Sequence, residues 1–146
     1  MMIPVLERTM VAPNIHNLRL IAPDVARSVQ PGQFVILQVE EDGERIPLTI
    51  SDWDVEKGEI TVVFMQVGAS TGKLAALKAG DTIPTAAGPL GNSMELGSFG
   101  TVICAGGCYG IASIYPVARA LKALNNHVIC VIEARSSFLF YWEEKL

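Results

Sequence analysis

A glycine-rich turn is the part of this chain best suited to bind a phosphate. Gly106, Gly107 and Gly110 follow a short apolar strand and precede a helix that begins around Ala112. Backbone N–H groups at such a turn, together with the positive end of the helix dipole, attract a negatively charged group. Glycine also lets the pyrophosphate of a dinucleotide approach the backbone closely. Because the pattern starts at Ala105, it is one glycine short of Gly-x-Gly-x-x-Gly, so the turn alone is a weak signal.

The other reactive side chains do not form the pattern of a metal site or a disulfide framework. Cys104, Cys108 and Cys130 are an odd number and have no Cys-x-x-Cys spacing, which argues against a cysteine-ligated cluster. His16 and His127 lie far apart and lack flanking ligands, so we predict no zinc site. The residue types therefore favour a bound nucleotide over a metal.

The first 98 residues read as a series of short strands. Segments rich in β-branched or alternating apolar residues lie at 15–21, 33–39, 45–50, 59–67 and 82–86. Short strands at this spacing are typical of a small antiparallel barrel or sandwich. Asp52-Trp53-Asp54 is expected to be a loop rather than a catalytic carboxylate pair, and we also expect a tight loop over 88–92.

One short helix interrupts these strands. Ser70 or Thr71 is the expected N-cap, and Leu74 and Leu77 form the apolar face. The segment from Lys78 to Asp81 is expected to end the helix. The sequence therefore predicts that a helix amino end lies beside the barrel.

From residue 99 the pattern changes to strand, helix, strand, which is a βαβ unit. Its elements are expected at 101–105, 112–124 and 127–133, and another helix is possible over 138–146. A parallel sheet normally needs more than two strands, so this second lobe looks unfinished. We therefore predict an antiparallel β-barrel domain over residues 1–98 and the first part of an α/β nucleotide-binding domain over 99–146.

The bulk composition excludes some classes of partner. Half of the 146 residues are apolar, the formal net charge is −4 and the mean hydropathy is +0.36. No basic stripe suited to nucleic acid is present, and no apolar run reaches the ~20 residues that span a bilayer. We expect a cytoplasmic protein without a secretion signal. The high apolar content predicts an exposed patch and hence a homo- or hetero-oligomer.

Four motifs in order carry a resemblance to a known family. The segments 45–51, 67–72, 88–92 and 106–110 together resemble the ferredoxin–NADP reductase-like flavoprotein superfamily. Within it the chain is most similar to the electron-transfer subunits of dihydroorotate dehydrogenase. It is similar also to the small subunits of sulfide dehydrogenase and of NADH-dependent NADP oxidoreductase. The resemblance covers nearly the whole chain.

The resemblance implies that the barrel binds FAD along the first motif. Thr49 would place its hydroxyl near the flavin ring as the catalytic group, and Pro47 and Leu48 would line the cofactor. Many relatives have an arginine three residues before this hydroxyl, where this chain has Ile46. Arg45 is the nearest cation for the FAD pyrophosphate, although a shift of one residue along a strand turns a side chain to the other face.

The resemblance also implies a phosphate-binding site and a strand that borders the flavin. The helix amino end would receive the FAD phosphates through Gly68, Ser70, Thr71 and Gly72. The preceding strand would border the flavin through Val63, Phe64 and Met65. An N-cap and a barrel core explain the same residues without a ligand, so that alternative stays open.

For the second lobe the resemblance implies a site for NAD(P)H. Gly106, Gly107 and Gly110 would hold the pyrophosphate. Glu133, at the end of the last strand, could bond the adenosine ribose and favour NAD over NADP, although relatives usually have a small residue there. Arg135 matches an arginine of the family. A solvated strand end with a charged pair is the alternative.

Together these features predict a flavoprotein electron-transfer subunit that moves electrons between NAD(P)H and a partner subunit through FAD. Longer relatives add a [2Fe–2S] cluster, which is expected only in a C-terminal part absent here. We therefore expect either a truncated product or a shortened relative completed by another chain, with FAD held better than the nicotinamide. The alternatives are a non-catalytic FAD- or nucleotide-binding module and a small Rossmann-type protein.

Overall fold

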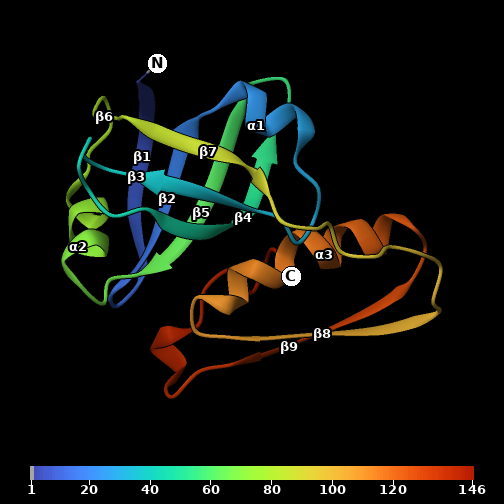
Figure 1. Cartoon of the computed structure of the whole chain (residues 1–146). Coiled ribbons are helices and arrows are strands. Elements are labelled where there is room, and N and C mark those ends of the chain that lie inside the picture. The colour runs from blue at the N-terminus through green and yellow to red at the C-terminus, as the bar shows by residue number, and fades with distance from the viewer. Residues whose placement is uncertain (1) are drawn as a thin grey trace.

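An antiparallel barrel and a smaller α/β unit make up the computed structural model, which describes residues 2–146 (Figure 1). The barrel strands are β1 (Ile3–Ala12), β2 (Ile15–Ile21), β3 (Phe34–Gln38), β4 (Ile46–Asp54), β5 (Glu59–Met65), β6 (Thr82–Ile83) and β7 (Thr85–Leu90). They form one sheet in the order β6-β1-β2-β5-β4-β3-β7. Because β6 and β7 follow each other in the chain, the two edges of the sheet come close and the sheet nearly closes.

The barrel core follows from the alternation of side chains along each strand. Leu20 on β2 and Val62 on β5 point inward and have no exposed surface. The helix α2 (Ala69–Ala76) covers part of the barrel, and its Leu74 joins the core. A shorter helix, α1 (Pro23–Ser28), adds two buried residues to the same core. The barrel is therefore a complete hydrophobic unit.

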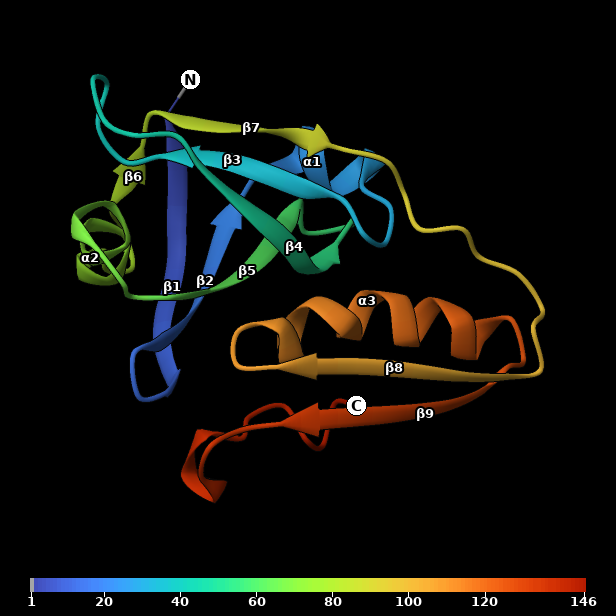
Figure 2. The same cartoon turned by 60° about the horizontal axis from the view of Figure 1, so that its bottom comes forward.

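The α/β unit consists of β8 (Thr101–Gly107), α3 (Gly110–Ala123) and β9 (His127–Glu133), and its two strands are parallel. Figure 2 shows α3 lying between this sheet and the barrel. The buried side chain of Asn126 fixes the entry to β8, because its Oδ1 accepts the N–H of Gly100 at 3.1 Å while its Nδ2 donates to the last turn of α3. The helix thus has one face toward β8 and β9 and another toward the barrel.

The predicted fold class is confirmed, with a barrel followed by a partial nucleotide-binding unit. The strand predicted over 15–21 is β2, and the strand predicted over 127–133 is β9. The elements β1 and α1 are absent from the sequence-based prediction, because β1 is interrupted by polar residues and α1 has only 6 residues. The division into two domains at residue 98 stays a prediction.

Two predicted loops are wrong. Asp52-Trp53-Asp54 belongs to β4, because Asp52 pairs with Thr61 on β5 and extends the strand beyond the predicted end. The loop predicted over 88–92 begins later, because Leu90 still pairs with Phe34 on β3. In both places pairing with a neighbouring strand overrides the local turn signal.

Two helix predictions are also wrong. The helix α2 begins at Ala69 and follows Gly68, because the Thr71 hydroxyl sits inside the first turn and accepts the N–H of Gly68 at 3.0 Å. The segment 138–146 forms only a short 3₁₀ turn, Ser137–Leu139, followed by further turns. Among the helices of residues 2–146, none combines the length and the apolar character that crossing a bilayer requires.

A histidine lies inside the barrel. His16 is 5% exposed, and its ring stacks on Phe64 with the centroids 5.4 Å apart. Its Nε2 donates to Oε1 of Gln66 at 3.3 Å, whereas its Nδ1 has no partner among the described residues. Burial lowers the pKa of His16 below its usual value, and the hydrogen bond to Gln66 opposes this only in part. The ring is therefore neutral in the folded protein.

We expect His16 to make the stability of the fold depend on pH. The unfolded chain takes up a proton below about pH 6.5, while the folded chain resists it, so stability is complete above that pH and is lost as the pH falls. Thermal and urea unfolding between about pH 7.5 and 5.5 should show a loss of up to about 1 kcal/mol per pH unit. His16→Gln should flatten this slope, and His127→Gln, which changes an exposed histidine, should not. An equal slope in His16→Gln would contradict the assignment.

Candidate functional site

The barrel and the α/β unit meet through a small buried cluster. Ile111 and Ala112, at the amino end of α3, are fully buried against Ile15 on β2 and Val63 on β5. Tyr141, from the segment after β9, completes this cluster and is 6% exposed. Val63, predicted to border a flavin, therefore has its side chain between the two units. The cluster sets how far α3 stands from the barrel.

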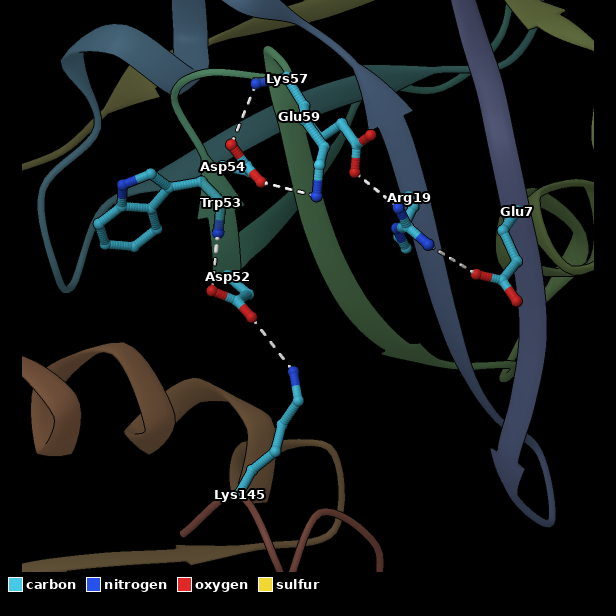
Figure 3. Close-up of polar contacts among 8 residues, drawn as sticks. All are labelled: Glu7, Arg19, Asp52, Trp53, Asp54, Lys57, Glu59 and Lys145. Carbon is cyan, nitrogen blue, oxygen red and sulfur yellow. Dashed lines mark hydrogen bonds and ion pairs between the residues drawn. The ribbon is translucent and has the colours of Figure 1, made fainter.

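An ion-pair clamp joins the two units beside this cluster. Asp52 on β4 accepts from Nη1 of Arg119 on α3 at 2.6 Å and from Nζ of Lys145 at 3.1 Å. The guanidinium of Arg119 also lies over the ring of Trp53, 4.8 Å from its centroid. Figure 3 shows Asp52 between Trp53 and Lys145. Sequence reasoning missed this clamp, because its partners are 67 and 93 residues apart in the chain and leave no local signal.

The first cavity lies between β4 and the free edge of β8, and its volume is about 460 Å³. Thr49 contributes the barrel wall, residues 102–105 of β8 form the opposite wall, and Ile114 and Val117 of α3 close one side. The walls are mostly apolar and carry one barrel hydroxyl. A cavity of this kind suits a flat ring system that takes one directed hydrogen bond.

The strand β4 turns its predicted ligand residues to different faces. Ile46 and Leu48 pack inward against the barrel core, so Pro47 and Thr49 point outward. Thr49 faces the first cavity, and Arg45, just before the strand, is exposed. Three of the four residues predicted along this motif are thus accessible, whereas Leu48 could meet a cofactor only through its backbone.

The amino end of α2, predicted to receive the FAD phosphates, is held by hydrogen bonds within its first turn. The Thr71 hydroxyl accepts the N–H of Val67 at 2.9 Å and that of Gly68 at 3.0 Å, which holds the turn in place. A Cβ built on Gly68 would meet no atom within 4 Å, so the turn is open to solvent. The Ser70 hydroxyl donates to the carboxylate of Glu44, so a phosphate bound here would have to replace that contact.

The second cavity opens at the end of β8, with a volume of about 500 Å³. It brings together Met65 from the barrel, Gly107 and Cys108 from the glycine-rich turn, and Glu133 and Arg135 from the end of β9. These residues come from three segments of the chain. Three of them, Gly107, Glu133 and Arg135, were predicted for the NAD(P)H site, and Met65 was predicted to border the flavin. The cavity therefore gathers a turn with glycines, a carboxylate and a guanidinium.

Close backbone approach requires glycine at position 106 and makes a side chain at position 107 tight. A Cβ on Gly106 would lie 2.6 Å from the carbonyl oxygen of Gly110, and one on Gly107 would lie 3.2 Å from that of Glu133. A Cβ on Gly110 would meet nothing within 4 Å. Gly106 and Gly107 thus let β8 lie close to α3 and β9, while Gly110 leaves open space at the helix start.

The remaining predicted residues do not line either cavity. Phe64 is 2% exposed in the barrel core, and Gly72 lies in the first turns of α2. Within residues 2–146, no three His, Cys, Asp or Glu side chains are close enough to hold a metal ion. The candidate site is thus the two cavities and the α2 amino end.

Burial raises the pKa values of Cys104 and Cys130, which leaves both thiols protonated.

The fold defines the class of protein. No family model matches the chain. Phthalate dioxygenase reductase, described as a modular structure for electron transfer from pyridine nucleotides to [2Fe–2S], superposes with a TM-score of 0.74. The match covers 99% of this chain and 47% of that one at 15% identity, so it concerns the fold alone. The chain has the fold of the ferredoxin–NADP reductase-like flavoproteins, as the four motifs predict.

The nearer relatives are more specific. The structure of an NADH-dependent reduced ferredoxin–NADP oxidoreductase, studied for flavin-based electron bifurcation, has a TM-score of 0.95 and 38% identity over 98% of this chain and 52% of that chain. A dihydroorotate dehydrogenase B (NAD(+)) electron transfer subunit homolog from Thermotoga maritima is 39% identical over 132 residues, which are 90% of this chain and 47% of that protein. The chain is thus homologous to these electron-transfer subunits and spans about half their length.

Removing the charge of Asp52 should loosen the contact between the two units. Asp52→Asn keeps the shape but loses both ion pairs, and because these are partly exposed we expect a loss of about 1 kcal/mol in the free energy of unfolding. The loss, measured by urea denaturation, should shrink in high salt because salt screens such pairs. The matched control is Asp54→Asn, since the ion pair of Asp54 among residues 2–146 is with Lys57, inside its own hairpin. Equal effects of the two variants would argue against a clamp.

Proposed function

We propose that this chain binds FAD on the barrel and passes electrons between NAD(P)H and a partner subunit. The observation that carries the proposal is the position of Thr49, which points outward from β4 into the first cavity, opposite β8. Homology to an NADH-dependent ferredoxin–NADP oxidoreductase supports the same assignment. When bound, FAD would supply the chemistry by accepting a hydride from the nicotinamide and releasing electrons one at a time.

The barrel residues would bind and orient the flavin. The Thr49 hydroxyl would donate a hydrogen bond to one edge of the ring, and Pro47 and the backbone of Leu48 would lie beside it. Of the three residues predicted to border the ring, Val63 and Phe64 are buried and Met65 lines the second cavity, so none of them would line the first cavity beside Thr49. The phosphates would bind at the α2 amino end, among Gly68, Ser70, Thr71 and Gly72, with Arg45 as the nearby cation.

The second cavity would take the adenosine and pyrophosphate of NAD(P)H. Gly106, Gly107 and Gly110 would admit the pyrophosphate to the amino end of α3. Glu133 would accept hydrogen bonds from a ribose and disfavour a 2′-phosphate, so NADH would be preferred. Arg135 would contribute positive charge at the same end of β9.

The wider assembly is also a proposal. We propose a barrel domain over residues 1–98, the start of a nucleotide domain over 99–146, and a cytoplasmic location. The relatives are electron-transfer subunits, which supports a partner subunit here. Exposed apolar side chains on the outer face of the β8–β9 sheet, such as Ile103 and Val131, support an oligomer.

Purified protein mixed with FAD and desalted should retain flavin absorbance. Gly72→Asp should weaken FAD binding about tenfold or more relative to Gly72→Asn, because the two side chains have the same shape and only one repels the phosphates. A side chain fits at Gly72, since its Cβ would lie 3.8 Å from the nearest atom, Nε2 of Gln66. An acid in the first turns also favours the helix, so folding should not suffer. Fluorescence titration of FAD gives both affinities.

Two further outcomes separate the proposed function from its alternatives. Bleaching of the bound flavin by NADH supports electron transfer. If Thr49→Val bleaches as fast as the wild type, the Thr49 hydroxyl has no role in the reaction. Retained flavin that NADH does not reduce identifies a non-catalytic binding module. A preparation that never retains flavin rejects the proposal and leaves the glycine-rich turn as the remaining candidate site.

Glu133 should decide between the two pyridine nucleotides. Glu133→Gln removes the repulsion of a 2′-phosphate, so the affinity for NADPH should rise about tenfold while that for NADH falls. Isothermal titration with both nucleotides measures the ratio. Glu143→Gln, which changes an exposed acid elsewhere in the same region, is the control. A parallel change for both nucleotides would exclude Glu133 as the selecting residue.

A further inference from the structure

The hydroxyl of Tyr141 is bound inside the glycine-rich turn. It donates to the carbonyl oxygen of Cys108 at 2.9 Å and accepts the N–H of Ala112 at 3.2 Å. The carbonyl of Cys108 is at the tip of the turn, and the N–H of Ala112 is in the first turn of α3. Tyr141 reaches them from a segment 33 and 29 residues away in the chain. One side chain thus connects the tip of the turn to the first turn of α3.

This tyrosine is held in place by its surroundings. Its ring packs with Ile15, Val63 and Ile111 in the cluster between the barrel and α3. Burial raises the pKa of its hydroxyl well above the usual range, so the proton that it donates to Cys108 remains at every physiological pH. A buried hydroxyl with both a donor and an acceptor contact fixes geometry, since its loss would leave the buried N–H of Ala112 without this partner, which is costly.

The turn needs such support because of its own conformation. Cys108 has a φ of 54°, in the left-handed region that residues other than glycine, asparagine and aspartate rarely adopt. Its carbonyl also accepts the N–H of Ile111 at 3.2 Å, and its Sγ lies 3.5 Å from Sδ of Met65 on the barrel. The turn is thus held by contacts with Ile111 on α3, with Met65 on the barrel and with Tyr141. Of these contacts, the Tyr141 hydroxyl is the one side-chain group that pairs with two backbone groups of the turn at once.

We propose that Tyr141 is a positioning residue for the nucleotide site: its hydroxyl holds the 106–112 turn in the shape that receives the pyrophosphate of the pyridine nucleotide. This inference rests on the proposed function of the turn. It adds to the site a side chain whose hydroxyl bonds the backbone of the turn and does not itself reach the nucleotide. Tyr141 acts through the backbone of Cys108 and Ala112, so its removal should affect the pyridine nucleotide and leave the flavin site on the barrel intact.

The test compares Tyr141→Phe with the wild-type chain. Phenylalanine keeps the ring packing and removes only the hydroxyl, while Tyr115→Phe removes a hydroxyl from α3 where the ring contacts Trp142. In Tyr141→Phe we expect the affinity for ADP-ribose to fall about tenfold, as loss of one directed hydrogen bond permits, with FAD affinity unchanged. Amide exchange at Ala112 should accelerate. Tyr141→p-aminophenylalanine, which restores a donor to Cys108, should recover part of the ADP-ribose affinity.

Each outcome decides between the inference and the proposed function. Binding of ADP-ribose by the wild type with no change in Tyr141→Phe overturns the positioning role and leaves the nucleotide site standing. Equal losses for ADP-ribose and FAD, with faster exchange throughout the chain, show a general stabilising role and also overturn it. If the wild type binds FAD but no ADP-ribose, the proposed nucleotide site fails, and the positioning role fails with it.

Discussion

The docking of the amino end of α3 onto the barrel is the constraint on which the rest of the structure depends. A two-stranded parallel sheet with one helix cannot bury enough apolar surface to be stable alone. The barrel supplies the missing cover, through Ile15 and Val63 against Ile111 and Ala112. Both cavities exist because of this contact: one lies between β4 and β8, and the other between the end of β5 and the glycine-rich turn.

Apolar contact and charge have different roles at this interface. The buried cluster sets the distance between the two units, since close-packed side chains tolerate little change in volume. The clamp at Asp52 sets their rotation, because its two cations come from α3 and from the C-terminal segment and converge on one carboxylate. The clamp is partly exposed and adds little stability. Its main effect is to select one orientation, which keeps Thr49 opposite β8.

The same arrangement places the two cavities beside each other along β8. The cavities lie along one strand, the first beside residues 102–105 and the second at Gly107, so ligands in them would share β8 as a common wall. Met65 and Cys108 touch across the boundary between the barrel and the glycine-rich turn. A short, rigid connection of this kind suits electron transfer, because electron transfer depends on fixed distances more than on acid–base groups.

Local sequence patterns determined most of the barrel strands but not β1, together with the βαβ order and the glycine-rich turn, because alternation, helix period and glycine spacing act over a few residues. The resemblance carried by four motifs added the family. Tertiary structure alone decided the strand at Asp52, the clamp to Arg119 and Lys145, and the place of Tyr141 within the turn. It also put Val63 and Phe64 in buried clusters, although both were predicted beside a ligand. These features arise from contacts between residues tens of positions apart, and such contacts leave no periodic signal in a single sequence.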